Sequence, residues 1–431
     1  MFEQLFGLGQ HNTTVRREVL AGVTTFLTMA YIIFVNPQIL SATGMDPGAV
    51  FVATCLAAAF GSAFMGLYAN YPVALAPGMG LNAYFTYGVV LGMGFTWQVA
   101  LGAVFLSGVI FFVISVTPVR EWIVNAIPKS LKMAISAGIG LFLGIIGLQE
   151  AGIVVAHPAT LVTLGDVTTW KVILASLGFV IMAALDARKV PGAIIIAILL
   201  VTAAGVILGV SPAGGIFSMP PSIAPTLLAM DLGGALNLGL AAIVFAFLFV
   251  DLFDNTGTLI GVAHRAGLLD KDGKLPRIGR ALMVDSTAAM VGAALGTSTT
   301  TSYIESAAGV RAGGRTGLTA VVVAILFLAA LFLSPLAGTI PAYATAPALV
   351  FVACLMTRGL TEIDWEDVTE YAPAVVAAVV MPLTFSIANG IAFGFITYAA
   401  IKLVSGRWKE IHPAVAVLAV LFIVKFAFIG S

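Results

Sequence analysis

The chain has 431 residues, of which 60% are hydrophobic and 9% are charged, and its formal net charge is zero. Soluble domains carry about 25% charged residues, so this composition predicts a polytopic membrane protein and excludes a large soluble domain. Zero net charge excludes the basic footprint of a nucleic-acid-binding protein. The two cysteines and four histidines form neither a disulfide framework nor a metal motif, so we expect no metal and no cofactor.

Residues 1–17 are mixed polar and precede a first apolar segment that has full membrane-spanning length and no cleavage site. Apolar spans are expected in the first half at residues 18–40, 49–69, 97–119, 131–148, 170–185 and 191–210, with an amphipathic piece at 119–127. In the second half they are expected at 234–262, 281–295, 318–336, 344–356, 374–387 and 391–403. The last apolar segment, residues 413–428, either spans the membrane or lies along it.

Two further spans are interrupted. The third, at residues 71–85, contains two prolines and two glycines, so a helix can begin only near Gly80. The tenth, at residues 296–309, is rich in hydroxyl and β-branched residues and ends in a short helical run near Arg311. Extended backbone inside a membrane must pair with other backbone or line a cavity. We therefore expect residues 73–76 and 297–300 to pair as a short sheet.

The two interrupted spans occupy corresponding positions in two halves of seven spans, and seven is odd, so the halves must be inverted relative to each other. The sequence predicts an all-α polytopic membrane protein with 14 transmembrane segments in two inverted repeats. The expected divisions are the cytoplasmic N-terminus 1–17, the first repeat 18–210, an extracytoplasmic connection 211–233, the second repeat 234–404 and the C-terminal apolar segment 405–431.

The basic residues support this orientation. With the N-terminus in the cytoplasm, every lysine and arginine except Lys171 and Lys425 falls in a cytoplasmic segment. The positive-inside rule then predicts an integral protein of the cytoplasmic membrane, in contact with lipid and with its N-terminus inside.

The eighth span carries four polar residues on one helical face, at i, i+3, i+4 and i+7: Asp251, Asp254, Asn255 and Thr258. Both carboxylates lie near mid-membrane, where a charge is costly and must face protein or a water-filled cavity. This face predicts a substrate or ion site. The alternative is a structural polar seam between helices.

Five stretches of the sequence resemble the adenine–guanine–hypoxanthine permeases, a branch of the nucleobase/cation symporter superfamily. They are residues 12–31, 76–83, 251–255, 300–305 and 381–388. The resemblance covers nearly the whole chain in order. It implies a core domain from spans 1–4 and 8–11, a gate domain from spans 5–7 and 12–14, an elevator-like cycle and a homodimer formed through the gate domains.

The resemblance also implies roles for individual residues. It makes Asp251 the carboxylate that binds the base and Glu305 the carboxylate on the tenth half-helix. It places Asn82 and Gly80 at the third-span contacts, and Asp254 at a second acidic position characteristic of this branch. The expected substrate contacts are completed by the hydroxyl residues Ser302 and Tyr303.

The chemistry of these residues agrees with a purine nucleobase as the bound partner. A base offers ring N–H donors and nitrogen acceptors; a carboxylate accepts from an N–H edge, and hydroxyl groups supply the rest. A carboxylate buried among apolar groups also binds a proton more readily, so Asp254, Asp251 and Glu305 are the candidates for proton coupling.

Other functions use the same features. An anion carrier of this fold would use the half-helix N-termini, but Asp251 and Glu305 would repel its substrate. A Na⁺-coupled carrier could take oxygen ligands from Asp254, Asn255 and Thr258.

An intramembrane aspartyl protease would pair Asp251 with Asp285, which lacks the expected glycine context. A passive channel would not need matching breaks in two halves. The sequence therefore predicts a transporter and not an enzyme.

Overall fold

The structure is a computed structural model that describes residues 2–117, 127–236, 241–268 and 275–428. Within this part of the chain, ten helical segments are long and apolar enough to cross a membrane, and the described part is a helical polytopic membrane protein. The amphipathic piece expected at 119–127 falls almost entirely outside the described residues.

The longer helices overlap the expected uninterrupted spans, and the first span consists of two helices, α2 and α3. Those of the first half are α2 (Val15–Met29), α3 (Ile32–Ser41), α4 (Pro47–Phe64), α6 (Trp97–Ser115), α8 (Lys129–Glu150), α9 (Trp170–Ala187) and α10 (Ala193–Ile207). Those of the second half are α12 (Ala241–Ala266), α13 (Ile278–Leu295), α15 (Gly317–Ala330), α17 (Ala342–Thr357), α18 (Val368–Leu383), α19 (Ile387–Val404) and α20 (Pro413–Phe428).

Short elements connect them. The helical ones are α1 (Phe2–Phe6), α5 (Met79–Ala83), α11 (Leu232–Ala235), α14 (Ser306–Arg311), α16 (Ser334–Thr339), the π-helical segments η1 (Met65–Ala69) and η2 (Tyr84–Gly92), and the 3₁₀ turns η4 (Leu331–Leu333), η5 (Arg358–Glu362) and η6 (Trp408–Glu410). The strands are β1 (Leu75–Pro77), β2 (Val154–His157), β3 (Leu161–Leu164) and β4 (Thr300–Ser302).

Side-chain caps set where several of these helices begin. Asp46 accepts a hydrogen bond from the backbone N–H of Ala49 at 2.7 Å, and Pro47 then occupies the first helical position. Thr14 and Thr96 cap α2 and α6 in the same way. Gly296, with φ +96°, ends α13 in the left-handed conformation that glycine adopts without strain.

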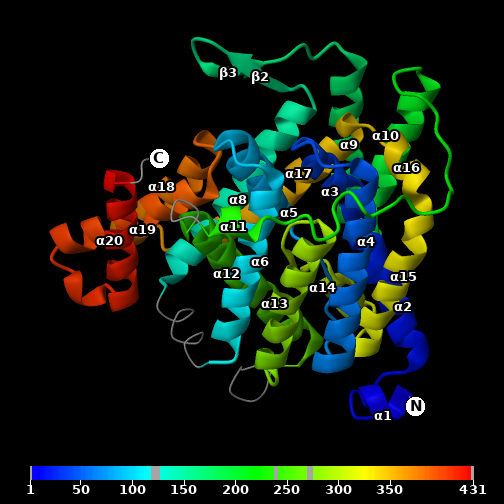
Figure 1. The fold of residues 1–431 in the computed structure, drawn as a ribbon, viewed down its shortest axis with the longest axis horizontal. Helices are drawn as coiled ribbons and strands as arrows, with labels where there is room; N and C mark the ends of the chain where they lie inside the picture. Colours follow the sequence, from blue (N-terminus) through cyan, green and yellow to red (C-terminus); the bar gives the residue numbers. More distant parts are fainter. Residues whose placement is uncertain (1, 118–126, 237–240, 269–274, 429–431) are drawn as a thin grey trace.

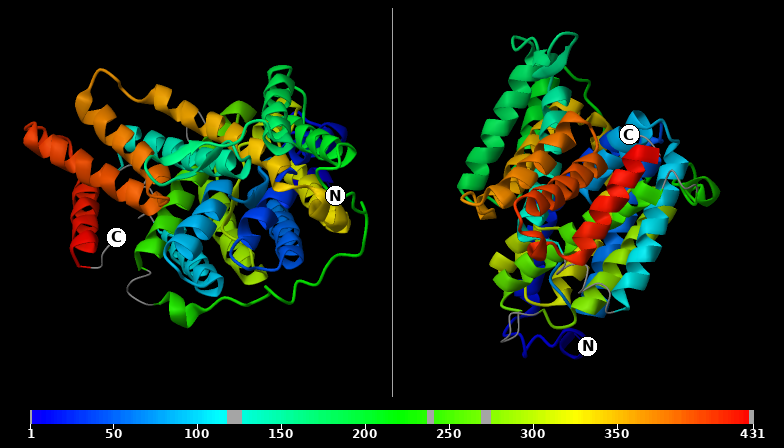
Figure 2. Two further views of the ribbon diagram at one scale, coloured as in Figure 1. Left: turned by 90° about the horizontal axis from the view of Figure 1, so that it is seen from above. Right: turned by 90° about the vertical axis from the view of Figure 1, so that its left-hand side faces the viewer.

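The helices pack in two groups. Helix α8 packs against α17 and α18, α18 packs against α19, and α9 packs against α10 and α17. In the other group α15 packs against α2 and α4, α13 packs against α4 and α6, and α12 packs against α6 and α14. Figures 1 and 2 show α18–α20 at one side of the molecule and α2, α4 and α15 at the other.

The short sheet expected between the two interrupted spans is present. Strands β1 and β4 are antiparallel, with Leu75 opposite Ser302 and Pro77 opposite Thr300. Both strands begin later than predicted from sequence. Thr297 still belongs to the end of α13, because its N–H donates to the carbonyl of Gly292 at 2.9 Å. The chain is therefore not free to enter a strand until after that cap.

Two further features differ from expectation. The eighth span does not begin near Gly234, since that residue lies in the separate helix α11, where Asp231 caps its N–H at 2.9 Å. A hairpin of β2 and β3, with exposed residues throughout β3, joins α8 to α9. In Figure 1 this hairpin stands at the end of the molecule opposite α1. No sequence pattern had predicted it.

Candidate functional site

The crossing of β1 and β4 is the centre of the candidate site. Beyond the paired residues, the N–H of Tyr303 donates to the carbonyl of Ala74, and the N–H of Gly78 donates to the carbonyl of Thr299, both at 2.9 Å. Every residue of both strands is buried. Extended backbone inside a membrane protein is stable when its N–H and carbonyl groups are hydrogen-bonded within the protein, as they are here.

Serine side chains complete that pairing. Ser62 on α4 accepts from the N–H of Leu75 at 2.9 Å and donates to its carbonyl at 3.1 Å. Ser306, the first residue of α14, accepts from the N–H of Ala74 at 3.0 Å. The strands are thus fixed to α4 and α14, so the crossing is a rigid base for the side chains around it.

A short helix leaves each strand at the crossing. Helix α5 begins at Met79, as predicted near Gly80, and continues as the π-helical segment η2. Helix α14 begins directly after Glu305, which occupies the N-cap position. Asn82 therefore lies in the first turns after one strand, and Glu305 lies at the start of the helix that follows the other.

Helix α12 passes beside both half-helices and packs against α5, β4 and α14. Asp251 is 2% exposed and Asn255 is 0% exposed on this helix. Thr258 is 8% exposed one turn further on. These three members of the predicted polar face are thus buried on a helix that packs against the elements carrying Asn82 and Glu305. The side chain of Asp254 lies outside the described residues.

Several buried polar groups around the crossing have no hydrogen-bond partner among the described residues. Both amide atoms of Asn82 and both amide atoms of Asn255 are in this state. The hydroxyl oxygens of three consecutive threonines are too: Thr299, Thr300 and Thr301. Leaving a buried donor or acceptor unpaired costs about 1–3 kcal/mol, so such a cluster points to a polar ligand or ordered water at this place.

Glu305 is half-buried and is held from the first span. The hydroxyl of Tyr31, at the junction of α2 and α3, donates to Oε1 of Glu305 at 2.7 Å. Tyr31 was not among the residues predicted from sequence. A tyrosine in an apolar span is expected to pack, and only the fold brings it to a carboxylate 274 positions away.

Three other predicted residues have identifiable neighbours. A Cβ added to Gly80 would lie 2.3 Å from Cγ2 of Ile139, so this glycine allows α5 to approach α8 closely. The Ser302 hydroxyl donates to Oδ1 of the buried Asp285 at 3.4 Å. The Tyr303 hydroxyl donates to the carbonyl of Pro77 at 2.6 Å. In this structure Ser302 and Tyr303 support the crossing and Gly80 packs against α8, and the substrate contacts of all three stay predictions.

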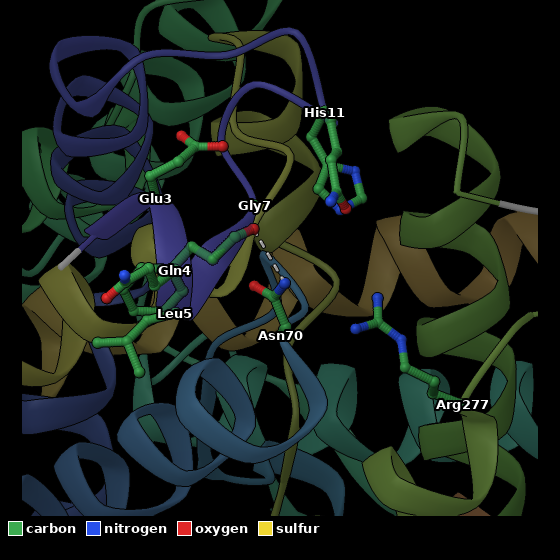
Figure 3. Close-up of a pocket in the computed structure, with 9 residues that line it drawn as sticks. Glu3, Gln4, Leu5, Gly7, His11, Asn70 and Arg277 are labelled. Atoms are coloured by element: carbon green, nitrogen blue, oxygen red, sulfur yellow. Dashed lines mark hydrogen bonds between the residues drawn. The ribbon is translucent and has the colours of Figure 1, made fainter.

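Among the described residues, no group of three or more His, Cys, Asp and Glu side chains is placed to hold a metal ion. A cavity of about 620 Å³ lies elsewhere, under the N-terminal segment, where Asn70 donates to the carbonyl of Phe6 at 3.1 Å (Figure 3). Arg277 and His11 also line this cavity. None of the site residues predicted from sequence is among its lining residues, so it is separate from the crossing.

Proteins of related sequence match this chain over nearly its whole length. Putative permease MJ0326 of Methanocaldococcus jannaschii is 58% identical over 430 residues, which are 100% of this chain and 99% of that protein. Adenine permease AdeP of Escherichia coli is 52% identical, covering 100% and 97%. Guanine/hypoxanthine permease PbuG of Bacillus subtilis is 47% identical, covering 98% and 99%.

A solved structure shares the fold. The transmembrane domain of the cyanobacterial bicarbonate transporter BicA superposes with a TM-score of 0.66 at 18% identity, covering 88% of this chain and 96% of that one. At that identity the likeness concerns the fold alone. Residues 16–427 match the sequence profile described as the Permease family. The chain therefore belongs to the Permease family.

Proposed function

We propose that this protein is a secondary active transporter that imports purine nucleobases, namely adenine, guanine or hypoxanthine, by proton symport. The named activities of the relatives, adenine permease and guanine/hypoxanthine permease, support a purine substrate. The carrying observation is the cluster of buried, unpartnered amides and hydroxyls at the crossing of two interrupted helices, beside Asp251. Such crossings are where transporters of inverted-repeat architecture bind substrate.

The donors and acceptors at the crossing match the edge of a purine. Asp251 accepts from a ring N–H, and Glu305 accepts a second hydrogen bond from the other side of the crossing. Asn82 supplies one donor and one acceptor, because an amide has both. Gly80, Ser302 and Tyr303 complete the contact surface. A flat base bound here would pair with polar groups that otherwise stay unsatisfied.

The coupling ion in this proposal is a proton. Asp251, Asp254 and Glu305 provide the carboxylates that take it up and release it, and no metal participates. A carboxylate that is neutral in one conformation and ionised in the other moves one proton per cycle. Asp254, one turn after Asp251 on α12, is the member proposed to sense the proton without touching the base.

Movement follows an elevator-like cycle in this proposal. The helices that carry the crossing, α2–α6 and α12–α15, form the moving core, and α8–α10 with α17–α19 form the gate. The separate packing of these two groups supports this division. The fourteen segments then form two inverted repeats, the gate domains pair in a homodimer within the lipid of the cytoplasmic membrane, and the N-terminus lies in the cytoplasm.

Uptake into proteoliposomes tests the function. We expect radiolabelled adenine, guanine or hypoxanthine to accumulate when the outside is more acidic than the inside, without Na⁺, and an uncoupler to abolish accumulation. Equilibration without accumulation would indicate a channel. Accumulation that requires a Na⁺ gradient at constant pH would contradict proton coupling.

A further inference from the structure

Tyr31 was not predicted as a site residue, yet it contacts Glu305, which was. Tyr31 is 1% exposed, so its hydroxyl has no access to bulk water and needs a partner inside the protein. That partner is Oε1 of Glu305, at 2.7 Å. The distance is typical of a hydroxyl hydrogen bond, and such a bond is stronger when its acceptor is ionised.

The surroundings keep this contact in place. Thr28, one turn before Tyr31, donates its hydroxyl to the carbonyl of Thr25 at 2.7 Å, and its Oγ1 also lies 3.5 Å from the main-chain carbonyl of Glu305. Helix α14 also lies directly against α2. A Cβ added to Gly309 of α14 would lie 2.0 Å from Oγ1 of Thr25 and 2.6 Å from the carbonyl of Ala21. Gly309 therefore allows the half-helix that begins after Glu305 to lie in close contact with the first span.

We propose that Tyr31 is a positioning residue for substrate binding: it fixes the direction of the Glu305 carboxylate and does not itself contact the base. This inference rests on the proposed purine transport. A glutamate side chain loses conformational entropy when it binds a ligand, because its rotatable bonds become fixed. A carboxylate that is already oriented binds more tightly, because part of that ordering is complete before the ligand arrives.

Tyr31 is held on a rigid support, the junction between α2 and α3. The two helices meet at Ala30 and Tyr31, and both residues keep helical dihedral angles. The phenol thus projects from a nearly continuous span, which is a more rigid support than a loop. Tyr31 and Glu305 consequently stay together if α2 and α14 move as one body.

A double-mutant cycle on purified protein tests the proposal. Dissociation constants for adenine, guanine and hypoxanthine are measured by calorimetry for wild type, Tyr31→Phe, Glu305→Gln and the double variant. Tyr31→Phe keeps the ring and removes only the hydroxyl, and we expect about tenfold weaker binding with little change in melting temperature. In the Glu305→Gln background the same change should weaken binding by less than about threefold, because the charge-assisted bond is already lost.

Tyr343→Phe is the matched control. It removes the hydroxyl of another buried tyrosine, which pairs with Ser211 at 2.7 Å on the connection after α10, and should leave purine binding unchanged. Equal losses in both Glu305 backgrounds, or unchanged binding by Tyr31→Phe, would overturn the inference alone. Wild-type protein that binds none of the three bases would overturn the proposed function, and this inference with it.

A second variant covers the case in which Tyr31→Phe does not fold. Glu305→Asp keeps the charge but shortens the side chain by one methylene, so the Tyr31 hydroxyl no longer reaches it. We expect about tenfold weaker purine binding here as well. Wild-type affinity in Glu305→Asp would show that the orientation fixed by Tyr31 is not needed.

Discussion

Two polar clusters of this protein, one around the buried Lys402 and one at the strand crossing, are built in opposite ways. At the ends of α18 and α19, Lys402 is completely buried, with Nζ 2.8 Å from Oε1 of Glu370 and 2.7 Å from Oε2 of Glu410. Arg407 pairs with Asp367 at 2.7 Å and with Glu410 at 2.8 Å. Every charge in this ion-pair cluster has a partner. At the strand crossing, by contrast, amides and hydroxyls are buried without partners among the described residues.

The difference distinguishes polar groups that stabilise the fold from polar groups that bind a ligand. A buried ion keeps the fold intact only when its partners compensate for the lost water, as they do around Lys402. An unpaired buried group lowers stability, and it persists where a ligand or a proton supplies the missing partner in part of the working cycle. The two clusters therefore respond differently to mutation: one in stability, the other in binding.

The largest effect is expected from Asp251→Asn. The shape is kept, but the acceptor-only carboxylate and its proton site are lost, so purine uptake should fall to background while the protein still reaches the membrane. Whole-cell uptake together with quantification of the protein in isolated membranes measures this. Normal adenine transport by Asp251→Asn would show that the assignment of this residue is wrong.

Asn82→Ala should have the next largest effect. Both amide atoms of Asn82 lack a partner in the described part of the chain, so their removal relieves a penalty in the empty protein and removes a hydrogen-bonding group for the edge of the base. We expect a changed ranking of adenine, guanine and hypoxanthine in a competition assay, with a melting temperature equal to or above that of wild type. A preserved ranking with reduced expression would instead identify Asn82 as a helix-start residue.

Lys402→Met should lower the stability of the protein and leave purine binding intact, which is the reverse of the effect expected for Asn82→Ala. The side chain is completely buried between two carboxylates, so its loss leaves Glu370 and Glu410 without their shared cation. We expect the melting temperature to fall by about 5 °C and the purine affinity of the folded protein to stay unchanged. Weakened binding in a variant of wild-type stability would mean that the ion-pair cluster communicates with the crossing.

The smallest effect is expected on the melting temperature at low pH. The Thr369 hydroxyl and the Arg407 guanidinium lower the pKa of Asp367 to about 2, and Arg407 and Lys402 lower the pKa of Glu410 to about 2. Both values lie below the ordinary range near 4, so this stabilisation is complete at neutral pH and is lost as the pH falls toward 2. The melting-temperature difference between wild type and Arg407→Ala should shrink below about pH 4.5. A constant difference down to pH 2 would contradict this.

The sequence predicted the crossing because its signals are local. Prolines and glycines around Gly78 exclude a continuous helix, and the threonine run before Tyr303 favours extended backbone. The starts of β1 and β4 were predicted two and three residues early. For β4 the reason is the bond from Thr297 to Gly292, which prolongs the cap of α13 and has no sequence signature.

The contacts of the site depend on the fold and could not be read from local patterns. Neither the bond from Tyr31 to Glu305 nor that from Ser302 to Asp285 follows from spacing in the chain. The same holds for the approach of Gly80 to Ile139, which joins residues of separate helices. The roles of Asp251, Asp254 and Asn82 at the substrate remain predictions from sequence.

A structure of the protein with a bound purine would show directly where the base binds. We expect a base beside the crossing of β1 and β4, with a ring N–H within hydrogen-bond distance of Asp251 and with Asn82 and Glu305 as further partners. The amides and threonine hydroxyls that are unpartnered here should then be paired with the base or with water around it. A base bound elsewhere, for example in the cavity lined by Asn70 and Arg277, with the crossing unchanged, would contradict the account.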